Sequence, residues 1–142
     1  MTRNAITSSR LAKPVGPFAH AVRSGQQIFL SGQVGEDPKT GKLVSGGIIA
    51  QTRQLLDNVA LLLDELGLSL AHVQKTTIFL VDIADFAAVN EVYAARFTKP
   101  YPARTTVSVQ ALPMSAAVEM DFIALGGAPQ ELSKFVPSVG LP

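Results

Sequence analysis

The chain has 142 residues, a net charge of +1 and no cysteine, with 47% hydrophobic and 16% charged residues. This length is typical of one domain that buries about two-thirds of its unfolded surface. Because lysine and arginine are scattered along a nearly neutral chain, nucleic acid is not an expected partner. The lack of cysteine excludes disulfides, a thiol nucleophile and a thiolate metal site.

Apolar segments are frequent but short. None near the N-terminus has the length of a signal peptide, and none can span a bilayer, so we expect a cytoplasmic protein without membrane contact. With so few charged residues, an apolar domain of this size has little polar surface with which to face water. We therefore expect an oligomer interface to bury part of that surface.

The N-terminal part predicts a loose start and a short hairpin. Residues 1–9 are polar, and the two prolines and the glycine in Leu11–Phe18 suit an extended segment. Ser24–Gly25 has the composition of a tight hairpin turn. The turn separates two predicted strands, Ala19–Arg23 and Gln27–Ser31.

Gly32 follows the second strand, where a glycine permits either a bulge or a close approach of the backbone to a ligand. Asp37–Gly41, with the sequence DPKTG, is a turn by composition. A long helix is then predicted from Ile48 to Leu66, and Gly67 suits its C-terminal end. Its apolar stripe recurs at three- and four-residue steps through Ile48, Thr52, Leu55, Val59, Leu62 and Leu66, and Asp64 lies off it.

The second half predicts a buried strand and another helix. Thr76–Val81 is a nearly continuous apolar run, which is typical of a central strand covered on both faces. Asp85–Phe97 has helical periodicity, with Phe86, Val89, Tyr93 and Phe97 on one face. Asn90 interrupts that stripe, and a buried amide needs hydrogen-bond partners, for which a neighbouring loop is the simplest source.

Two further strands are predicted at Thr105–Gln110 and Ala117–Leu125. In the second, Glu119 and Asp121 alternate with apolar residues that point to the opposite face. If a turn at Leu112–Pro113 joined these strands as a hairpin, Glu119 would lie opposite Thr106 and diagonal to Arg104. We expect an α+β fold with the order strand, strand, helix, strand, helix, strand, strand, in a single domain over residues 1–125. Residues 126–142, rich in glycine and proline, are expected to form an irregular extension.

Arg104 and Glu119 are the strongest candidates for chemistry. A guanidinium matches the fork of a carboxylate, although an ion pair with Glu119 or Asp121 is the more usual role for an arginine at a strand edge. Burial would raise the pKa of Glu119 and help it exchange protons near neutral pH. The alternative is a solvated carboxylate on the strand surface that takes no part in chemistry. Neither His20 nor His72 has metal-ligand spacing, and no phosphate-binding loop occurs, so we expect no metal and no nucleotide cofactor.

Two motifs near the C-terminal end have a defined spacing: PAR at Pro102–Arg104 is followed by VEM at Val118–Met120, with Glu119 fifteen positions after Arg104. The upstream motifs are GPF at Gly16–Phe18, SGQ at Ser31–Gln33, QTRQLLDNV at Gln51–Val59, KTTIFLVD at Lys75–Asp82 and DFAAVNEVY at Asp85–Tyr93. In this order the motifs resemble those of the Rid family, the reactive intermediate deaminases also called the YjgF family.

This resemblance implies a chorismate-mutase-like α+β fold, with a mixed sheet packed against two helices, in a homotrimer with sites between subunits. It implies hydrolysis of reactive enamines and 2-imino acids to 2-oxo acids and ammonia, like a 2-iminobutanoate/2-iminopropanoate deaminase, without a cofactor. Arg104 would bind the substrate carboxylate, and Glu119 would position water and transfer protons. The pocket would be lined by Phe18, Ser31, Gly32, Asn90 and Thr106.

The chain departs from the family pattern at Phe18, where many deaminating members carry tyrosine, and at Thr106, where cysteine is common. The missing tyrosine hydroxyl favours an alternative, a non-catalytic module that binds a small carboxylate or 2-oxo acid. Ribonuclease activity, reported for some relatives, fits poorly with a chain that lacks a basic aromatic groove.

Overall fold

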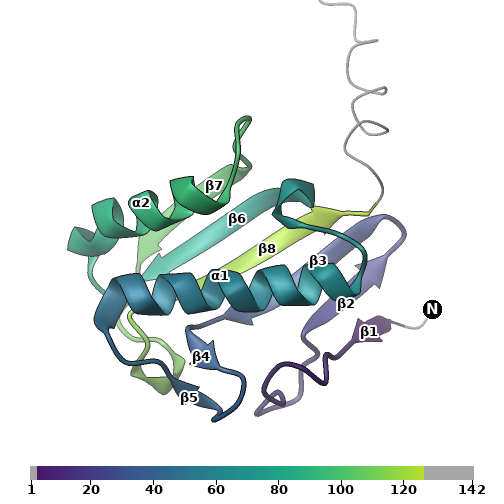
Figure 1. Ribbon diagram of the computed structural model, residues 1–142, viewed down its shortest axis with the longest axis horizontal. Helices are drawn as coiled ribbons and strands as arrows, with labels where there is room; N and C mark the ends of the chain where they lie inside the picture. Colours follow the sequence, from purple (N-terminus) through teal and green to yellow (C-terminus); the bar gives the residue numbers. More distant parts are fainter. Residues whose placement is uncertain (1–2, 127–142) are drawn as a thin grey trace, which may run out of the picture.

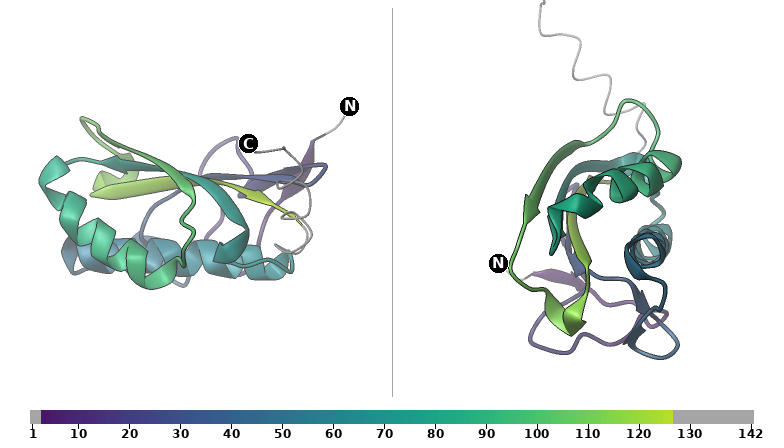
Figure 2. Two further views of the ribbon diagram at one scale, coloured as in Figure 1. Left: turned by 90° about the horizontal axis from the view of Figure 1, so that it is seen from above. Right: turned by 90° about the vertical axis from the view of Figure 1, so that its left-hand side faces the viewer.

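Two helices cover one face of a six-stranded sheet in the computed structural model, which describes residues 3–126 (Figure 1). The views in Figure 2 show both helices on the same side, with the other face of the sheet free of helices. The helices are α1 (Gly47–Glu65) and α2 (Phe86–Arg96). The sheet has the order β1-β2-β3-β8-β6-β7, with β1 (Asn4–Ile6), β2 (Ala21–Ser24), β3 (Gln27–Gln33), β6 (Val73–Leu80), β7 (Ala103–Ser108) and β8 (Val118–Leu125).

The predicted α+β class is confirmed, and both predicted helices are present within two residues of their expected bounds. In α1 the apolar stripe packs on the sheet, and Leu55 and Leu62 are fully buried. Gly67 ends the helix as expected, with a positive φ of 73°. The N–H groups of Gly67 and Leu68 donate to the carbonyls of Asp64 and Leu63, which satisfies two carbonyls of the last turn.

The hairpin of β2 and β3 also forms as predicted, with Ser24 paired to Gln27 across the turn. The β3–β8 register shifts between Leu30 and Gln33, so Gly32 lies in the bulge that its sequence position suggested. Beyond the bulge, β4 (Glu36–Asp37) and β5 (Lys42–Leu43) form a second, two-stranded sheet around the predicted DPKTG turn.

The predicted hairpin between the last two strands is wrong. β6 lies between β7 and β8, pairing in parallel with β7 and antiparallel with β8. Arg104 is therefore a neighbour of Thr76, and Glu119 is a neighbour of Phe79. Strands that follow one another in sequence need not be neighbours in the sheet, and here β6, which precedes both in the chain, lies between β7 and β8.

Two smaller expectations also need correction. The polar N-terminus is not entirely loose, because Asn4–Ile6 form β1 and pair with β2. β6 is central but is buried on one face only: Ile78 and Leu80 are fully buried on the helix side, whereas Thr77 and Phe79 on the other side are partly exposed. The predicted C-terminal extension falls almost wholly on residues 127–142, which lie outside the described residues.

Candidate functional site

The sequence-predicted site residues form two groups, on opposite faces of the sheet. In parallel and antiparallel pairs, residues that are neighbours across the ladder point to the same face. Arg104 pairs with Thr76, which is fully buried on the helix side, whereas Glu119 pairs with Phe79 on the open side. One chain therefore does not bring Arg104 and Glu119 together.

The first group surrounds the guanidinium of Arg104. Its Nη2 donates to Oδ1 of Asn90, and its Nε donates to Oγ1 of Thr106 at 3.1 Å. The guanidinium carbon lies 4.9 Å from the centre of the Tyr93 ring and 5.4 Å from that of Phe86, within cation–π range. The amide of Asn90 thus has its partner in β7 rather than in a loop. The side chain of Arg104 is therefore held by residues of α2 and by Thr106 of its own strand, β7.

Arg104 makes no ion pair with any acidic side chain among residues 3–126, where the two ion pairs are Arg10–Glu65 and Arg96–Asp57. The pairing with Glu119 or Asp121 that the sequence left open does not occur. A half-buried guanidinium whose partners are neutral keeps its charge available for an incoming anion.

The second group surrounds the carboxylate of Glu119. A Cβ added to Gly32 would lie 2.2 Å from Oε2 of Glu119, so the carboxylate rests directly on the glycine in the bulge of β3. Burial raises the pKa of Glu119 above its ordinary value of 4.5, and the nearby charge of Asp121 raises it further. This carboxyl group therefore takes up a proton more readily than a solvated glutamate does.

Phe18 and Ser31 line the same cavity as Glu119 and Gly32. Phe18 is 53% exposed and presents an apolar ring. The hydroxyl of Ser31 donates to the carbonyl of Ala19 at 2.7 Å, so its proton is already used and its oxygen can act toward a ligand only as an acceptor. These four residues therefore share one cavity, whereas Arg104, Asn90 and Thr106 form the other group.

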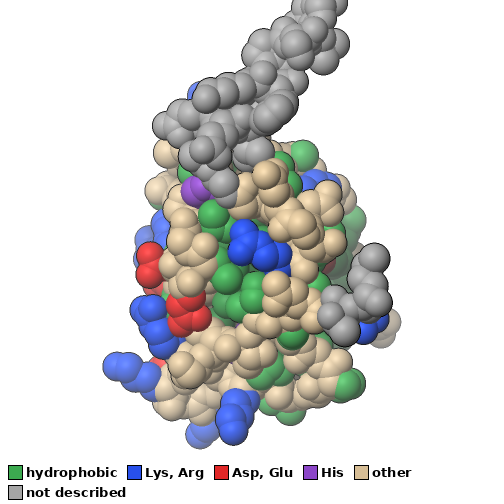
Figure 3. Space-filling view, turned by 90° about the vertical axis from the view of Figure 1, so that its right-hand side faces the viewer, with side chains coloured by type: hydrophobic (Ala, Val, Ile, Leu, Met, Phe, Trp, Pro, Cys, Tyr) green, Lys and Arg blue, Asp and Glu red, His purple; other side chains and the backbone are tan. Residues whose placement is uncertain are grey.

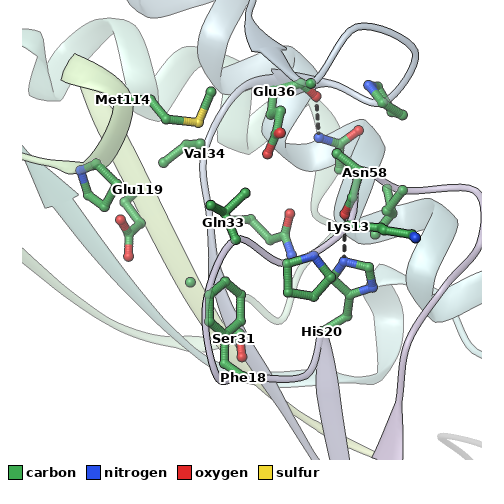
Figure 4. Close-up of a pocket in the computed structure, with 18 residues that line it drawn as sticks. Lys13, Phe18, His20, Ser31, Gln33, Val34, Glu36, Asn58, Met114 and Glu119 are labelled. Carbon is green, nitrogen blue, oxygen red and sulfur yellow. Dashed lines mark hydrogen bonds between the residues drawn. The ribbon is translucent and has the colours of Figure 1, made fainter.

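The cavity has a volume of about 680 Å³ and continues beyond these four residues (Figure 4). Its further lining comes from the extended segment before β2, from the segment after β3 and from the short 3₁₀ turn Pro113–Ser115. Sequence analysis missed Met114 and Glu36 because both lie in irregular or very short elements. This further lining includes Lys13, His20, Val34, Glu36, Pro38 and Met114.

Within the described part of the chain, no group of three or more His, Cys, Asp or Glu side chains could hold a metal ion. No helix among residues 3–126 is long and apolar enough to cross a membrane. On the face drawn in Figure 3, basic side chains lie apart from one another, among acidic, apolar and other polar groups, without forming a continuous stripe.

The fold and the two groups define an α+β protein with a half-buried arginine on the edge strand β7 and a cavity lined by Glu119 at the inner strands β3 and β8. The family model described as Endoribonuclease L-PSP matches residues 7–126. The chain belongs to this family, which includes the Rid or YjgF proteins, so the resemblance found in the motifs is confirmed.

Three relatives illustrate the range of the family. The chain is 46% identical over 127 residues to protein DfrA of Myxococcus xanthus, covering 88% of this chain and 97% of that protein. It is 38% identical over 127 residues to human 2-iminobutanoate/2-iminopropanoate deaminase, covering 89% and 93%. The crystal structure of E. coli TdcF with bound serine matches with a TM-score of 0.81 at 34% identity, covering 87% of this chain and 98% of that one.

Proposed function

We propose that the protein is a hydrolytic deaminase that converts reactive 2-imino acids and enamines into 2-oxo acids and ammonia. The observation that carries the proposal is the half-buried guanidinium of Arg104, which is held by neutral partners and has no acidic side chain to neutralise it among residues 3–126. The human relative named for this reaction and the relative with bound serine support an amino-acid-like ligand.

The site would be completed by a second copy of the chain. Arg104 and Glu119 occupy opposite faces of one sheet, so a substrate that meets both must lie between two chains. The open sheet face supports such an assembly because Phe29 and Val107 are 40% and 39% exposed there. The edge of β7 away from β6 has no strand partner among the described residues, and assembly would also cover it. A homotrimer, in which each cleft takes one group from each of two neighbours, satisfies these demands.

In this cleft Arg104 would bind the substrate carboxylate, and the carboxylate of Glu119 would act on water. The water oxygen adds to the imine carbon while Glu119 accepts a proton from the water. Glu119 then returns this proton to the nitrogen, which gives a carbinolamine with a hydroxyl and an amino group on the same carbon. Glu119 next accepts the hydroxyl proton and delivers it to the amino group, so the C=O bond forms as the C–N bond breaks, ammonia leaves and the 2-oxo acid remains. One water is consumed and Glu119 is unchanged. The imine carbon is already electrophilic, so positioning and one proton carrier suffice.

The first test replaces Arg104 with alanine. Binding of 2-oxobutyrate should weaken by roughly tenfold to a hundredfold, because a charge-assisted pair contributes about 1.5–3 kcal/mol. The melting temperature should hardly change, since the substitution strands no buried anion. Titration calorimetry and a thermal melt measure the two effects, and a sharply lowered melting temperature with retained binding would make Arg104 a structural residue.

The second test mixes two inactive proteins. Arg104→Ala and Glu119→Gln chains should each fail to release 2-oxo acid from imines made by an amino-acid oxidase. After the two are unfolded together and refolded, some clefts would receive Arg104 from one chain and Glu119 from the other. Recovery of part of the activity is expected, and a mixture as inactive as its components would contradict a shared cleft.

A non-catalytic module that binds small carboxylates remains the second candidate because Phe18 supplies no hydroxyl in the cavity. The same coupled assay separates the two functions. A deaminase accelerates the release of 2-oxo acid from freshly formed imine, whereas a binding module binds 2-oxobutyrate and leaves that rate unchanged.

A further inference from the structure

A second carboxylate, that of Glu36, faces the cavity that holds Glu119 (Figure 4). Val34 and Gln33 lie between the two carboxylates in this view. Glu36 belongs to the short strand β4, after the bulge in β3, and none of the functional roles considered so far uses it.

The backbone of Glu36 is firmly held, whereas its carboxylate is free. Its N–H donates to the carbonyl of Val34 at 2.8 Å, and its carbonyl accepts from Nδ2 of Asn58 at 2.8 Å. Among residues 3–126 no hydrogen bond or ion pair involves its carboxylate oxygens. Burial raises the pKa of this carboxyl group above its ordinary value of 4.5, and the nearby His20 offsets part of that rise. Such a group gains from a donor supplied by a ligand.

The basic side chains nearest the cavity do not fill this role. His20 accepts the N–H of Ser8 at Nδ1, at 3.0 Å, and lies 2.9 Å from the carbonyl of Ala12 through Nε2. Both ring nitrogens of His20 are thus engaged by the backbone, and neither hydrogen-bonds to Glu36. Lys13 is exposed and makes no ion pair in the described part of the chain, so its charge is screened by solvent.

The cavity that holds Glu119 and Glu36 has apolar walls, to which Val34, Pro38 and Met114 contribute. A cavity of about 680 Å³ is of the size that binds drug-sized ligands and exceeds what a substrate of three or four carbons fills.

We propose that this arm of the cavity selects 2-imino acids whose long side chain has an apolar stem and ends in a cationic hydrogen-bond donor such as a guanidinium, which Glu36 binds. The inference rests on the proposed deaminase function, since it places the reacting carbon beside Glu119. The stem would lie against Val34 and Met114, and the planar guanidinium would donate two hydrogen bonds to the carboxylate.

The experiment compares two imines of similar stem length, made by an amino-acid oxidase from arginine and from norleucine. The kcat/KM for the imine made from arginine, divided by the kcat/KM for the imine made from norleucine, should fall roughly tenfold or more in Glu36→Gln. Asp64→Asn is the matched control, because Asp64 is an exposed carboxylate on α1 outside this cavity, and it should leave both rates unchanged. Glu36→Leu should lose the same preference for the imine made from arginine, and a thermal melt checks that this variant is folded.

Calorimetry with the stable products, 2-oxo-5-guanidinopentanoate and 2-oxohexanoate, tests the arm without turnover. A preference for the guanidino acid that disappears in Glu36→Gln supports the proposal. If neither imine is accelerated but this binding preference holds, the deaminase function fails and the specificity stands. Equal binding of both acids, a preference that survives Glu36→Gln, or no binding of either acid overturns the proposal.

Discussion

Gly32 and Glu119 illustrate how a single missing side chain shapes the site. The carboxylate of Glu119 occupies the space where a Cβ on residue 32 would lie. The sequence indicated that Gly32 permits a bulge or a close approach, and the structure shows the bulge together with this contact. It did not indicate what approaches the glycine, because the contact depends on the pairing of β3 with β8, which is non-local.

Gly32→Ala should therefore impair catalysis more than stability. The added methyl displaces the flexible end of Glu119, and we expect the hydrolysis rate to fall by about tenfold or more, with a small change in melting temperature. Gly35→Ala is the contrasting variant, because its Cβ would lie 2.6 Å from backbone atoms of Gln51, which cannot yield easily. It should lower the melting temperature clearly. Equal melting temperatures for the two variants would contradict this reading of the contacts.

The pH dependence of the reaction should report the raised pKa of Glu119. As the pH falls through this pKa, Glu119 becomes protonated and can no longer accept a proton from water. Because burial and Asp121 both raise the pKa, the acid limb of the pH–rate profile should lie above 4.5.

Asp121→Asn removes one of these two causes, so the acid limb should move to lower pH. A pH–rate profile of kcat/KM for both proteins measures the shift, with Asp64→Asn as a control that should leave the limb in place. An acid limb that stayed fixed in Asp121→Asn would show that another group controls the rate.

At the scale of helices and strands, the periodic segments were predictable and their partners were not. The α1 stripe could be predicted because helical periodicity depends on residues three and four positions apart. The strands β2, β3, β6, β7 and β8 were each predicted to within three residues, because alternation and β propensity are also local signals. The two-residue strands β4 and β5 were not predicted. The partner of β7 could not be inferred, since no local pattern states that β6 lies between β7 and β8. Because β6 lies between them, Arg104 and Glu119 are not neighbours on one face, as the hairpin would have made them, but lie on opposite faces.

The stripe of α1 supports a test of the helix face. Leu55→Ala should lower the free energy of unfolding by about 2–5 kcal/mol, because Leu55 is fully buried and its truncation leaves a cavity. Asp64→Ala, at an exposed position on the same helix, should cost little. Denaturant melts of the two variants compare them directly, and similar losses would show that the helix packs through another face.

At the scale of the whole molecule, the described chain leaves a sheet face with large exposed apolar side chains and holds Arg104 and Glu119 on opposite faces of the sheet. Composition had already suggested a covered surface, because the chain is so apolar. Which surface is covered depends on the tertiary fold, and only the fold shows that the helices leave the face bearing Phe29 and Val107 open.

The protein should therefore be a trimer in solution at micromolar concentration, because a single chain would leave this face and the β7 edge in water. Light scattering gives the molar mass of the particle directly. Val107→Lys should weaken the assembly by placing a charge on the open face, whereas Lys39→Ala, at an exposed residue of the β4–β5 turn, should not. A stable wild-type monomer would contradict the prediction.

The placement of Arg104 and Glu119 on opposite faces has a consequence in time. A newly folded chain would hold every side chain it needs and still lack a working cleft, so acquiring structure and acquiring activity become separate events. During refolding, helical signal should return at a rate independent of dilution, whereas activity should follow after a lag that lengthens as the protein is diluted, because chains must first collide. Until that collision, each chain carries only the unjoined halves of two different clefts.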